Sequence, residues 1–574
     1  MDKKDVARLL DQIAAFLELK GDNPFRIRAY QTAARAVSAY TGDLKRASDT
    51  GELAELKGVG PGTSEIIREV LATGSAQVLN QLRSEIPPGL VEMMGISGLG
   101  VAKIQQIHEN LGIDSLAELE AAARDGRLAR LPRFGPKTAQ KILRSLAFLR
   151  RSIDYRLFHH ARNESERFAK ALSELSGVVN VTTAGSVRRR HELIRDLDFV
   201  VQTDKPGYEL ADRLGNLVGV HEFEGKAPGA FTLRFTSDTV ADVYICSAAT
   251  RGFELMWATG SQSHLNGLQA RATTLGLEWA SEGLRKGDEM IPCATEEAVY
   301  QALQMQFIPP ELREGTGEIE AAVAYQIPAL VTAKDIQGFI HCHTNYSDGT
   351  STVAEWAEAA LAAGYRYVGI TDHSAAATYA GGLFMDSIGE QHAEIDNVNR
   401  SVSGVRVLKG VEVDILESGA LDYDADTRSR FEFVIASVHN RFGQSRSEMT
   451  DRILRAMDDP TMAILGHPTG RLLLSREPYP MDLDAIFEKA LDRNIAIEIN
   501  AHPQRLDLDW RHVRRAADMG IVISIGADAH STAGMSNLDL GIGIARKGWL
   551  TAEQILNTRP LEGFLEFVNR RVVN

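Results

Sequence analysis

The sequence predicts a multidomain protein with three kinds of structure in succession: a helical N-terminal region, an α+β middle region and an α/β barrel-like C-terminal domain. At 574 residues the chain exceeds the size at which a single hydrophobic core keeps growing. Residues 1–150 show helix-like apolar spacing interrupted by glycine-rich breaks, and residues 160–250 contain strand-like apolar runs. From Gly338 onward strands alternate with helices, which is the pattern of a parallel α/β barrel.

The composition predicts a folded protein, and we expect it to be cytoplasmic. Apolar residues make up 44% and charged residues 24% of the chain, both near the averages for globular proteins. The N-terminus MDKKDVARLL is charged and helix-like, and no segment reaches the roughly 18 consecutive apolar residues that a membrane span needs. The three cysteines, Cys246, Cys293 and Cys342, are too few and too scattered for a disulfide framework. We therefore expect no membrane partner.

The net charge of −14 is unevenly distributed along the chain. Residues 1–150 hold 21 Lys and Arg against 18 Asp and Glu, a balance of +3, so the remainder carries −17. The acidic excess thus lies in the part that also contains the candidate metal ligands described below.

Three breaks in the helical N-terminal region resemble one another. They are LKGVGPGTSEIIREVL from Leu56, MMGISGLGVAKIQQIHENL from Met93 and LPRFGPKTAQKILRSL from Leu131. Each joins an apolar residue, a glycine turn and an amphipathic helix, and such a turn offers backbone N–H groups to a phosphate without reading the base sequence. These glycines could instead be simple helix caps, but the recurrence of the same flanks favours DNA binding.

Carboxylates and arginines gather in the middle region. GSVRRR at 185–190 is followed by Asp196 and Asp198, which share one face of a strand, and Asp242 lies in a second strand, VADVYI. Three carboxylates beside a Gly-Ser turn and arginines suit two Mg²⁺ ions and a triphosphate. Alone, the D-x-D pattern would more often be a solvated strand end.

These motifs resemble the family X nucleotidyltransferases over about residues 1–320. The resemblance implies helix-hairpin-helix modules at the N-terminus, with Gly58, Gly60, Gly98, Gly100, Gly135 and Lys137 at the DNA, followed by a palm and a thumb. It implies that Asp196, Asp198 and Asp242 are catalytic and hold Mg²⁺ or Mn²⁺. It further implies that the incoming dNTP is bound by Gly185, Ser186 and Arg189 of the palm and by Gly260, Ser261 and His264 of the thumb motif TGSQSH.

The C-terminal region carries nine metal-capable residues at the ends of successive predicted strands. Since alternate residues of a strand share a face, His341 and His343 should point the same way, and Cys342 should point away. Imidazoles with carboxylates suit Zn, Mn or Fe, and the ligands are too many for one ion. The nine are His341, His343, Asp348, His373, Glu412, His439, His467, Asp528 and His530.

The strings HCHTNYSDGT, GITDHS, GVEVDI, ASVHNRF, LGHPTG and GADAH resemble the PHP (polymerase and histidinol phosphatase) family across about residues 338–574. The resemblance implies a distorted seven-stranded (β/α)7 barrel and a cluster of two to three ions, Mn²⁺ or else Zn²⁺ or Fe. In polymerase-fused members it implies a manganese-dependent 3′-5′ exonuclease, with AP endonuclease or 3′-phosphatase activity in some. Asp372 lies outside the ligand set and is better interpreted as a supporting carboxylate.

Several positions depart from the family X pattern. Gly62 and Ile66 stand where family lyases carry lysines, so no amine is present there for Schiff-base chemistry. Gln262, Leu265 and Gln269 replace residues that often contact nucleotide or template, and Arg190 replaces the usual glycine after GSxRR. None of these changes removes a metal ligand.

The domains we expect are a helical DNA-binding region at 1–150, a palm at 151–250, a thumb at 251–318, a linker at 319–337 and a PHP phosphoesterase at 338–574. The function we expect is gap-filling repair synthesis with 3′-end processing on gapped, nicked or recessed DNA, by a monomer at the nucleoid. The alternative is a DNA-end binding nuclease with a catalytically weak polymerase module. A small-molecule phosphatase is disfavoured by the DNA-binding repeats.

Overall fold

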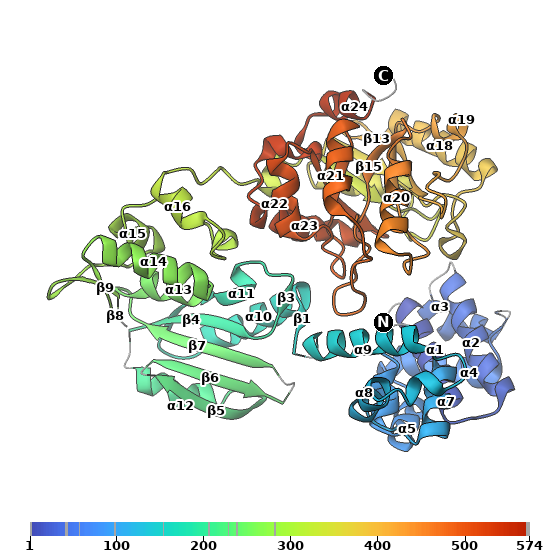
Figure 1. Ribbon diagram of the computed structural model, residues 1–574, viewed down its shortest axis with the longest axis horizontal. Helices are drawn as coiled ribbons and strands as arrows, with labels where there is room; N and C mark the ends of the chain where they lie inside the picture. The colour runs from blue at the N-terminus through green and yellow to red at the C-terminus, as the bar shows by residue number, and fades with distance from the viewer. Residues whose placement is uncertain are drawn as a thin grey trace. The chain divides into compact units, whose positions relative to one another are not determined.

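The chain folds into two compact units, Met1–Asp154 and Tyr155–Asn574 (Figure 1). The structure is a computed structural model that describes residues 3–40, 44–54, 56, 58–96, 99–152, 154–204, 207–227, 229–236, 239–280 and 283–569. No helix among these residues is both long enough and apolar enough to cross a membrane.

The first unit is entirely helical over its described residues. Apolar residues at helical spacing, such as Leu10, Ile13 and Leu17, are fully buried in a core that belongs to this unit alone. Three of its helices, α4, α7 and α9, begin directly after a glycine turn. The helices are α1 Lys3–Leu19, α2 Pro24–Ala39, α3 Leu44–Thr50, α4 Pro61–Thr73, α5 Gln77–Glu85, α6 Pro88–Met93, α7 Val101–Leu111, α8 Leu116–Arg124 and α9 Pro136–Ser152.

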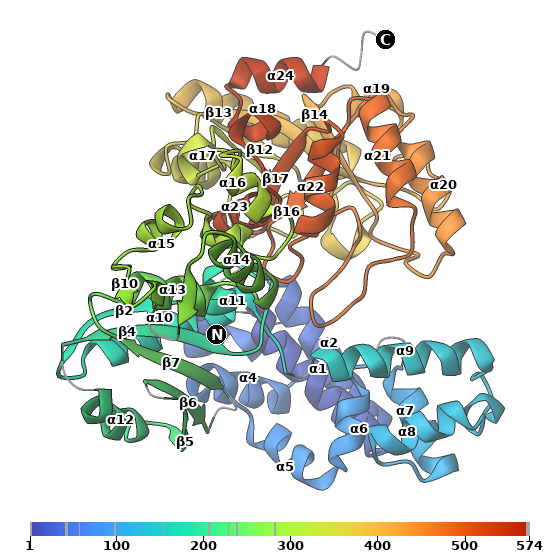
Figure 2. The same cartoon turned by 60° about the vertical axis from the view of Figure 1, so that its left-hand side comes forward.

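The second unit begins with the palm, a five-stranded sheet in the order β2-β4-β7-β6-β5 (Figure 2). Its central strands β4 and β7 run parallel, and the other pairs are antiparallel. The strands are β2 Val178–Thr183, β4 Leu197–Thr203, β5 Val220–Ala227, β6 Ala230–Phe235 and β7 Val240–Cys246, with a separate pair β1 Arg156–Leu157 and β3 Leu193–Ile194. The helices are α10 Phe158–Ser173, α11 Gly185–Arg188 and α12 Gly207–Gly215.

The thumb follows with its own small core around Phe253, Met256 and Tyr300. Its elements are α13 Arg251–Thr259, α14 Gln262–Thr274, β8 Glu278–Ala280, β9 Gly283–Lys286, β10 Glu289–Met290, α15 Glu296–Ala302 and α16 Glu318–Val323. The segment 319–337, expected to be a linker, contains most of α16 and buries Ala322 and Val331 completely. It is therefore a packed connection.

The C-terminal part is a closed barrel of seven parallel strands in sequential order, β11 to β17. All the strands but one are fully buried runs of mainly apolar residues, as expected of parallel strands covered by helices, and the exception leaves Arg406 and Lys409 partly exposed. The strands are β11 Gly338–Cys342, β12 Tyr367–Ile370, β13 Arg406–Asp414, β14 Phe433–Ser437, β15 Met462–Leu465, β16 Ala496–Asn500 and β17 Ile523–Ala529. The predicted (β/α)7 barrel is confirmed.

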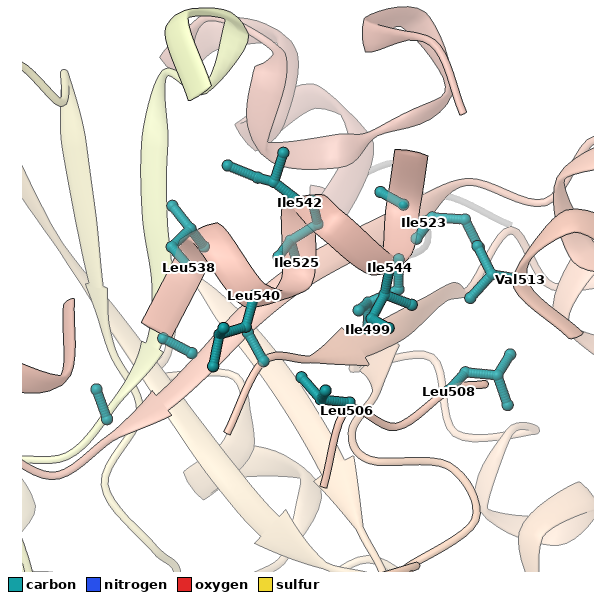
Figure 3. Packing of buried hydrophobic residues seen from close by; sticks show 14 of the residues in the cluster. Ile499, Leu506, Leu508, Val513, Ile523, Ile525, Leu538, Leu540, Ile542 and Ile544 are labelled. Atoms are coloured by element: carbon teal, nitrogen blue, oxygen red, sulfur yellow. The ribbon is translucent and has the colours of Figure 1, made fainter. Parts of the chain in front are cut away.

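Eight helices surround the barrel: α17 Val353–Ala362, α18 Met385–Ser401, α19 Ala425–Arg428, α20 Arg446–Ala456, α21 Leu483–Asp492, α22 Trp510–Asp518, α23 Leu538–Lys547 and α24 Leu561–Asn569. Helix α23 packs Leu538, Leu540, Ile542 and Ile544 into the apolar layer that contains Ile499 of β16 and Ile525 of β17 (Figure 3). The remaining short elements of the chain are the 3-10 helices η1 Glu52–Ala54, η2 Leu128–Arg130, η3 Pro310–Leu312, η4 Ala333–Asp335, η5 Thr378–Ala380, η6 Thr532–Asn537, η7 Ala552–Gln554 and η8 Leu556–Thr558.

Candidate active sites

Glu412 lies at the centre of the histidine cluster, at the carboxyl end of β13, and is fully buried. One or other of its carboxylate oxygens is within 3.7 Å of a nitrogen of five imidazoles. The distances are 2.9 Å to His373, 3.0 Å to His467, 3.3 Å to His439, 3.5 Å to His341 and 3.7 Å to His343. Burial alone would raise its pKa, but His439, His373 and His341 outweigh burial and hold the pKa of Glu412 well below its ordinary value. Glu412 is thus an ionised carboxylate.

The other carboxylates complete the cluster. Asp528 Oδ1 is 3.2 Å from His343 Nε2, and Asp348 Oδ2 is 3.1 Å from His530 Nε2. Three overlapping sets of side chains have ligand atoms close enough together to hold an ion. These sets are His343, Asp348, His373 and His530; His341, His343 and Asp528; and His373, Glu412 and His439. All nine predicted residues therefore come together, with His467 joined through Glu412.

The donor set fits divalent cations. The orphaned donor and acceptor atoms include Nε2 of His341, both ring nitrogens of His343 and Oε2 of Glu412, which are buried without a hydrogen-bond partner. Buried polar atoms without partners are costly, and metal ions would satisfy them. Nitrogen and carboxylate ligands suit Zn, Mn or Fe without selecting among them.

A second layer of carboxylates orients the histidines. Glu498 on β16 lies 2.5 Å from His341 Nδ1, and Asp414 on β13 lies 2.6 Å from His439 Nδ1. Such contacts fix the ring and leave the other nitrogen for the metal. Asp372 accepts hydrogen bonds from Thr344, Ser347 and Gln391, which is the supporting role expected of it.

The palm carboxylates meet where β4 and β7 run side by side. Asp198 and Asp242 are opposite each other in the parallel register, and Asp196 precedes β4 directly. Gly185 closes the site from α11: its φ is +58°, and a Cβ there would lie 1.7 Å from Asp198 Oδ2. Only glycine permits so close an approach.

The charges of the palm site repel one another. Burial first, and then the neighbouring charges of Asp196 and Asp242, raise the pKa of Asp198 to about 7. Lys226 Nζ lies 2.6 Å from Asp242 Oδ2, and Thr232 donates a hydrogen bond to Oδ1. A site that concentrates negative charge in this way suits divalent cations.

The comparisons with known proteins agree with this geometry. Residues 1–76 match the family model of a helix-hairpin-helix domain, 90–147 a SAM-like helix-hairpin-helix tandem, 254–314 the DNA polymerase beta thumb and 340–502 the PHP domain. The chain is 34% identical over 575 aligned residues to the DNA polymerase/3′-5′ exonuclease PolX of Bacillus subtilis, covering 99% of this chain and 100% of that protein. The chain belongs to the PolX family.

Shorter relatives match only part of this PolX-family chain. Probable phosphatases of Thermoanaerobacter sp. (strain X514) and Clostridium acetobutylicum are 27% and 28% identical over 229 residues, which is 38% of this chain and 89% of each of those proteins.

The helix-hairpin-helix turns of the PolX-family chain are open. Gly60 and Gly100 are the N-caps of α4 and α7, and Gly135 precedes α9. A Cβ added at any of the three would meet no atom within 4 Å. Gly58 lies in the glycine turn before α4 and has φ +104°. Lys137 is exposed at the beginning of α9. Gly98 lies outside the described residues.

The residues predicted to bind the nucleotide lie in the palm and in the thumb, and one of them, His264, is buried away from solvent. Ser186 Oγ is buried without a hydrogen-bond partner, and Arg189 donates to the Thr259 carbonyl at 2.7 Å. Gly260 ends α13, and Ser261 caps α14. The His264 ring, in contrast, is fully buried, with its nitrogens 2.8 Å from Glu318 and 3.1 Å from Tyr300. The His264 side chain therefore stabilises the turn at Gly260 and Ser261 through these buried contacts.

Sequence reasoning missed the residues that support the sites. Glu498 could have been predicted to support a site, because it is a lone carboxylate inside the apolar run IAIEIN. Glu314 and Lys547 gave none, although Lys547 is fully buried and lies 2.6 Å from Glu314.

Proposed function

We propose that this chain is a DNA repair enzyme that fills short gaps in DNA with dNTPs at the palm and removes nucleotides from 3′ ends at the barrel. The observation that carries the proposal is the presence, in one chain, of a carboxylate cluster on adjacent parallel strands and a nine-residue cluster at the ends of barrel strands. The full-length similarity to the Bacillus subtilis protein supports both activities.

At the palm, Asp196, Asp198 and Asp242 would hold Mg²⁺ or Mn²⁺. The Ser186 hydroxyl and the Arg189 guanidinium would bind the triphosphate, since a hydroxyl and a planar guanidinium both donate to phosphate oxygens. Gly260 and Ser261 would bring backbone groups of the thumb to the same nucleotide, with His264 fixing the turn.

At the barrel, the nine-residue set would hold two to three ions, for which we propose Mn²⁺, with Zn²⁺ or Fe as alternatives. Divalent ions at either site would lower the pKa of a bound water or hydroxyl and stabilise charge on the phosphate. Arg505, whose Nε is 3.3 Å from Asp528 Oδ2, lines a cavity with Tyr379 and His502 beside the cluster. This cavity would receive the terminal nucleotide.

We further propose that Gly58, Gly60, Gly98, Gly100, Gly135 and Lys137 contact DNA phosphates. The open space at Gly60, Gly100 and Gly135 supports this, because neither protein packing nor an unusual φ demands glycine there. The domain limits we propose are those at 150, 250, 318 and 337, in a monomer at the cytoplasmic nucleoid.

A second candidate is a DNA-end binding nuclease with a weak polymerase module. The contact that favours it is Arg189 Nε with Glu314 Oε1 at 3.1 Å, because a guanidinium engaged by a carboxylate is less available to a triphosphate. Gln262 likewise donates to Asn266 at 2.9 Å within its own helix.

The test uses labelled DNA with a one-nucleotide gap, with Mg²⁺ and with Mn²⁺. We expect Asp196→Ala/Asp198→Ala to lose extension alone and His341→Ala/His343→Ala to lose 3′ degradation alone. The exposed Asp212→Ala and the α22 variant His512→Ala serve as matched controls that keep both activities. Extension absent from the unaltered chain would replace the first function with the second; degradation that survives loss of the two histidines would refute the barrel assignment.

A further inference from the structure

Lys547, the last residue of α23 on the barrel, is a buried lysine whose partners lie in the palm and thumb. Its side chain is 0% exposed. Its Nζ donates to the Arg189 carbonyl at 3.0 Å, to Glu314 Oε1 at 2.6 Å and to the Glu311 carbonyl at 3.4 Å. An ammonium group has three N–H donors, so these acceptors satisfy it completely.

Glu314 is shared between two cations. Its Oε1 atom accepts from Lys547 Nζ at 2.6 Å and from Arg189 Nε at 3.1 Å. Burial acts against its charge, but Lys547 and then Arg189 lower the pKa of Glu314 below its ordinary value. The carboxylate is therefore ionised and divides its attraction between the barrel lysine and the palm arginine.

We propose that Lys547 is a positioning residue for nucleotide addition, contributed by the barrel: it holds the Arg189 backbone and competes for Glu314, leaving the Arg189 guanidinium available to a dNTP triphosphate. This inference rests on the proposed polymerase function and on Arg189 as a triphosphate ligand. Without Lys547, Glu314 would be left to pair with Arg189 alone, and a triphosphate would have to displace it.

The helix that carries Lys547 is held firmly enough to act in this way. Its apolar residues are buried against β16 and β17 (Figure 3), and Lys547 Nζ also lies 4.9 Å from the centre of the Trp510 ring on α22. At the start of α23, Asp539 accepts from Arg190 through its carbonyl at 2.9 Å and its carboxylate at 3.1 Å. A Cβ on Gly543 would lie 2.8 Å from Arg190 Cδ, so the arginine stem packs directly on the helix.

The test measures the steady-state kinetics of dNTP addition on gapped DNA by the full chain. We expect Lys547→Met to raise the KM for dNTP about tenfold with kcat nearly unchanged, the effect of losing one charged hydrogen bond. We expect Glu314→Gln to lower that KM, since it removes the competitor for Arg189. The double variant should follow Glu314→Gln, because Lys547 acts largely through Glu314. Lys489→Met, which removes an ion-paired lysine from α21, is the matched control.

A general packing defect would shift both single variants in the same direction, so opposite shifts support the proposal. Exonuclease activity and thermal unfolding on the same samples report folding, and Glu314→Gln carries the test if Lys547→Met does not fold. A KM within twofold of the unaltered chain in both variants, or a rise in both, overturns the role of Lys547. Absence of extension from the unaltered chain would instead overturn the polymerase function itself.

Discussion

Glu412 faces five imidazoles from different parts of the barrel, which makes it the central carboxylate of the cluster. We expect Glu412→Gln, which keeps the shape and removes the charge, to lower exonuclease activity about 100-fold or more and to reduce the bound metal. Metal analysis of the purified variant, with the exposed Glu488→Gln as control, tests this. A variant with full metal content and full activity would exclude Glu412 as a ligand.

Glu254 on α13 has no place in either site, and burial raises its pKa from 4.5 to about 7. The folded state therefore favours the protonated form, so the stabilising contribution is complete below pH 4.5 and is lost as the pH rises to about 7. At pH 8 the buried charge costs at most about 3 kcal/mol.

Glu254→Gln should consequently raise the melting temperature at pH 8 by a few degrees and change it little at pH 4.5, where the native glutamate is already neutral. Thermal unfolding at the two pH values measures the difference. The exposed Glu297→Gln should show no such dependence. An equal shift at both pH values would mean that packing, and not charge, accounts for the effect.

At the scale of elements, the strand β11 shows which side-chain directions the alternation of a strand predicts and which it does not. Alternation predicted that His341 and His343 would point together with Cys342 turned away, and Cys342 is indeed buried in the apolar core while the two rings lie 5.5 Å apart. The strand is not regular, however: its register shifts on both sides and His341 has φ +62°. A bulge of this kind changes the direction of a side chain, and the sequence HCHT does not predict it.

The glycine turns before α4, α7 and α9 give a prediction at the same scale. A Cβ added at Gly100, whose φ is −71°, would meet no protein atom within 4 Å. We expect Gly100→Leu to cost no more than about 1 kcal/mol of stability, because leucine is a poorer N-cap than glycine, yet to weaken binding of gapped DNA about tenfold by blocking a phosphate.

Fluorescence anisotropy with labelled DNA measures the affinity, and thermal unfolding measures the stability. Gly389→Leu, at an equally open glycine of α18 in the barrel, is the matched control. Unchanged DNA affinity in Gly100→Leu, with the fold intact, would remove the α7 turn from the DNA interface.

For the whole molecule, residue patterns within one strand or turn predicted the candidate sites, but they did not predict contacts between residues far apart in the sequence. The clustering of the metal-capable residues could be predicted because each lies in or shortly after the last residues of an apolar strand, and the barrel brings these strand ends together. The Arg190–Asp539 and Lys547–Glu314 contacts join residues 349 and 233 positions apart. No local pattern marks such pairs, since they arise only when the barrel packs on the palm and thumb.

The two units have separate hydrophobic cores, and this separation predicts how the molecule unfolds. One apolar cluster contains Phe199 and Val243 of the palm together with Ile497 of the barrel, whereas the N-terminal helices have a core of their own. We therefore expect two thermal transitions. Ile104→Ala, at a fully buried position in α7, should lower only the transition of the first unit, with a cost of about 2 to 5 kcal/mol for the cavity.

Differential scanning calorimetry on the full chain distinguishes the transitions, and Ile497→Ala is the matched substitution in the second unit. That variant should lower the other transition and reduce extension and degradation together at raised temperature, because one core supports both sites. Ile104→Ala should instead weaken DNA binding on warming while degradation of short single strands persists. A single transition that both variants shift equally would mean that the two units unfold as one, despite their separate cores.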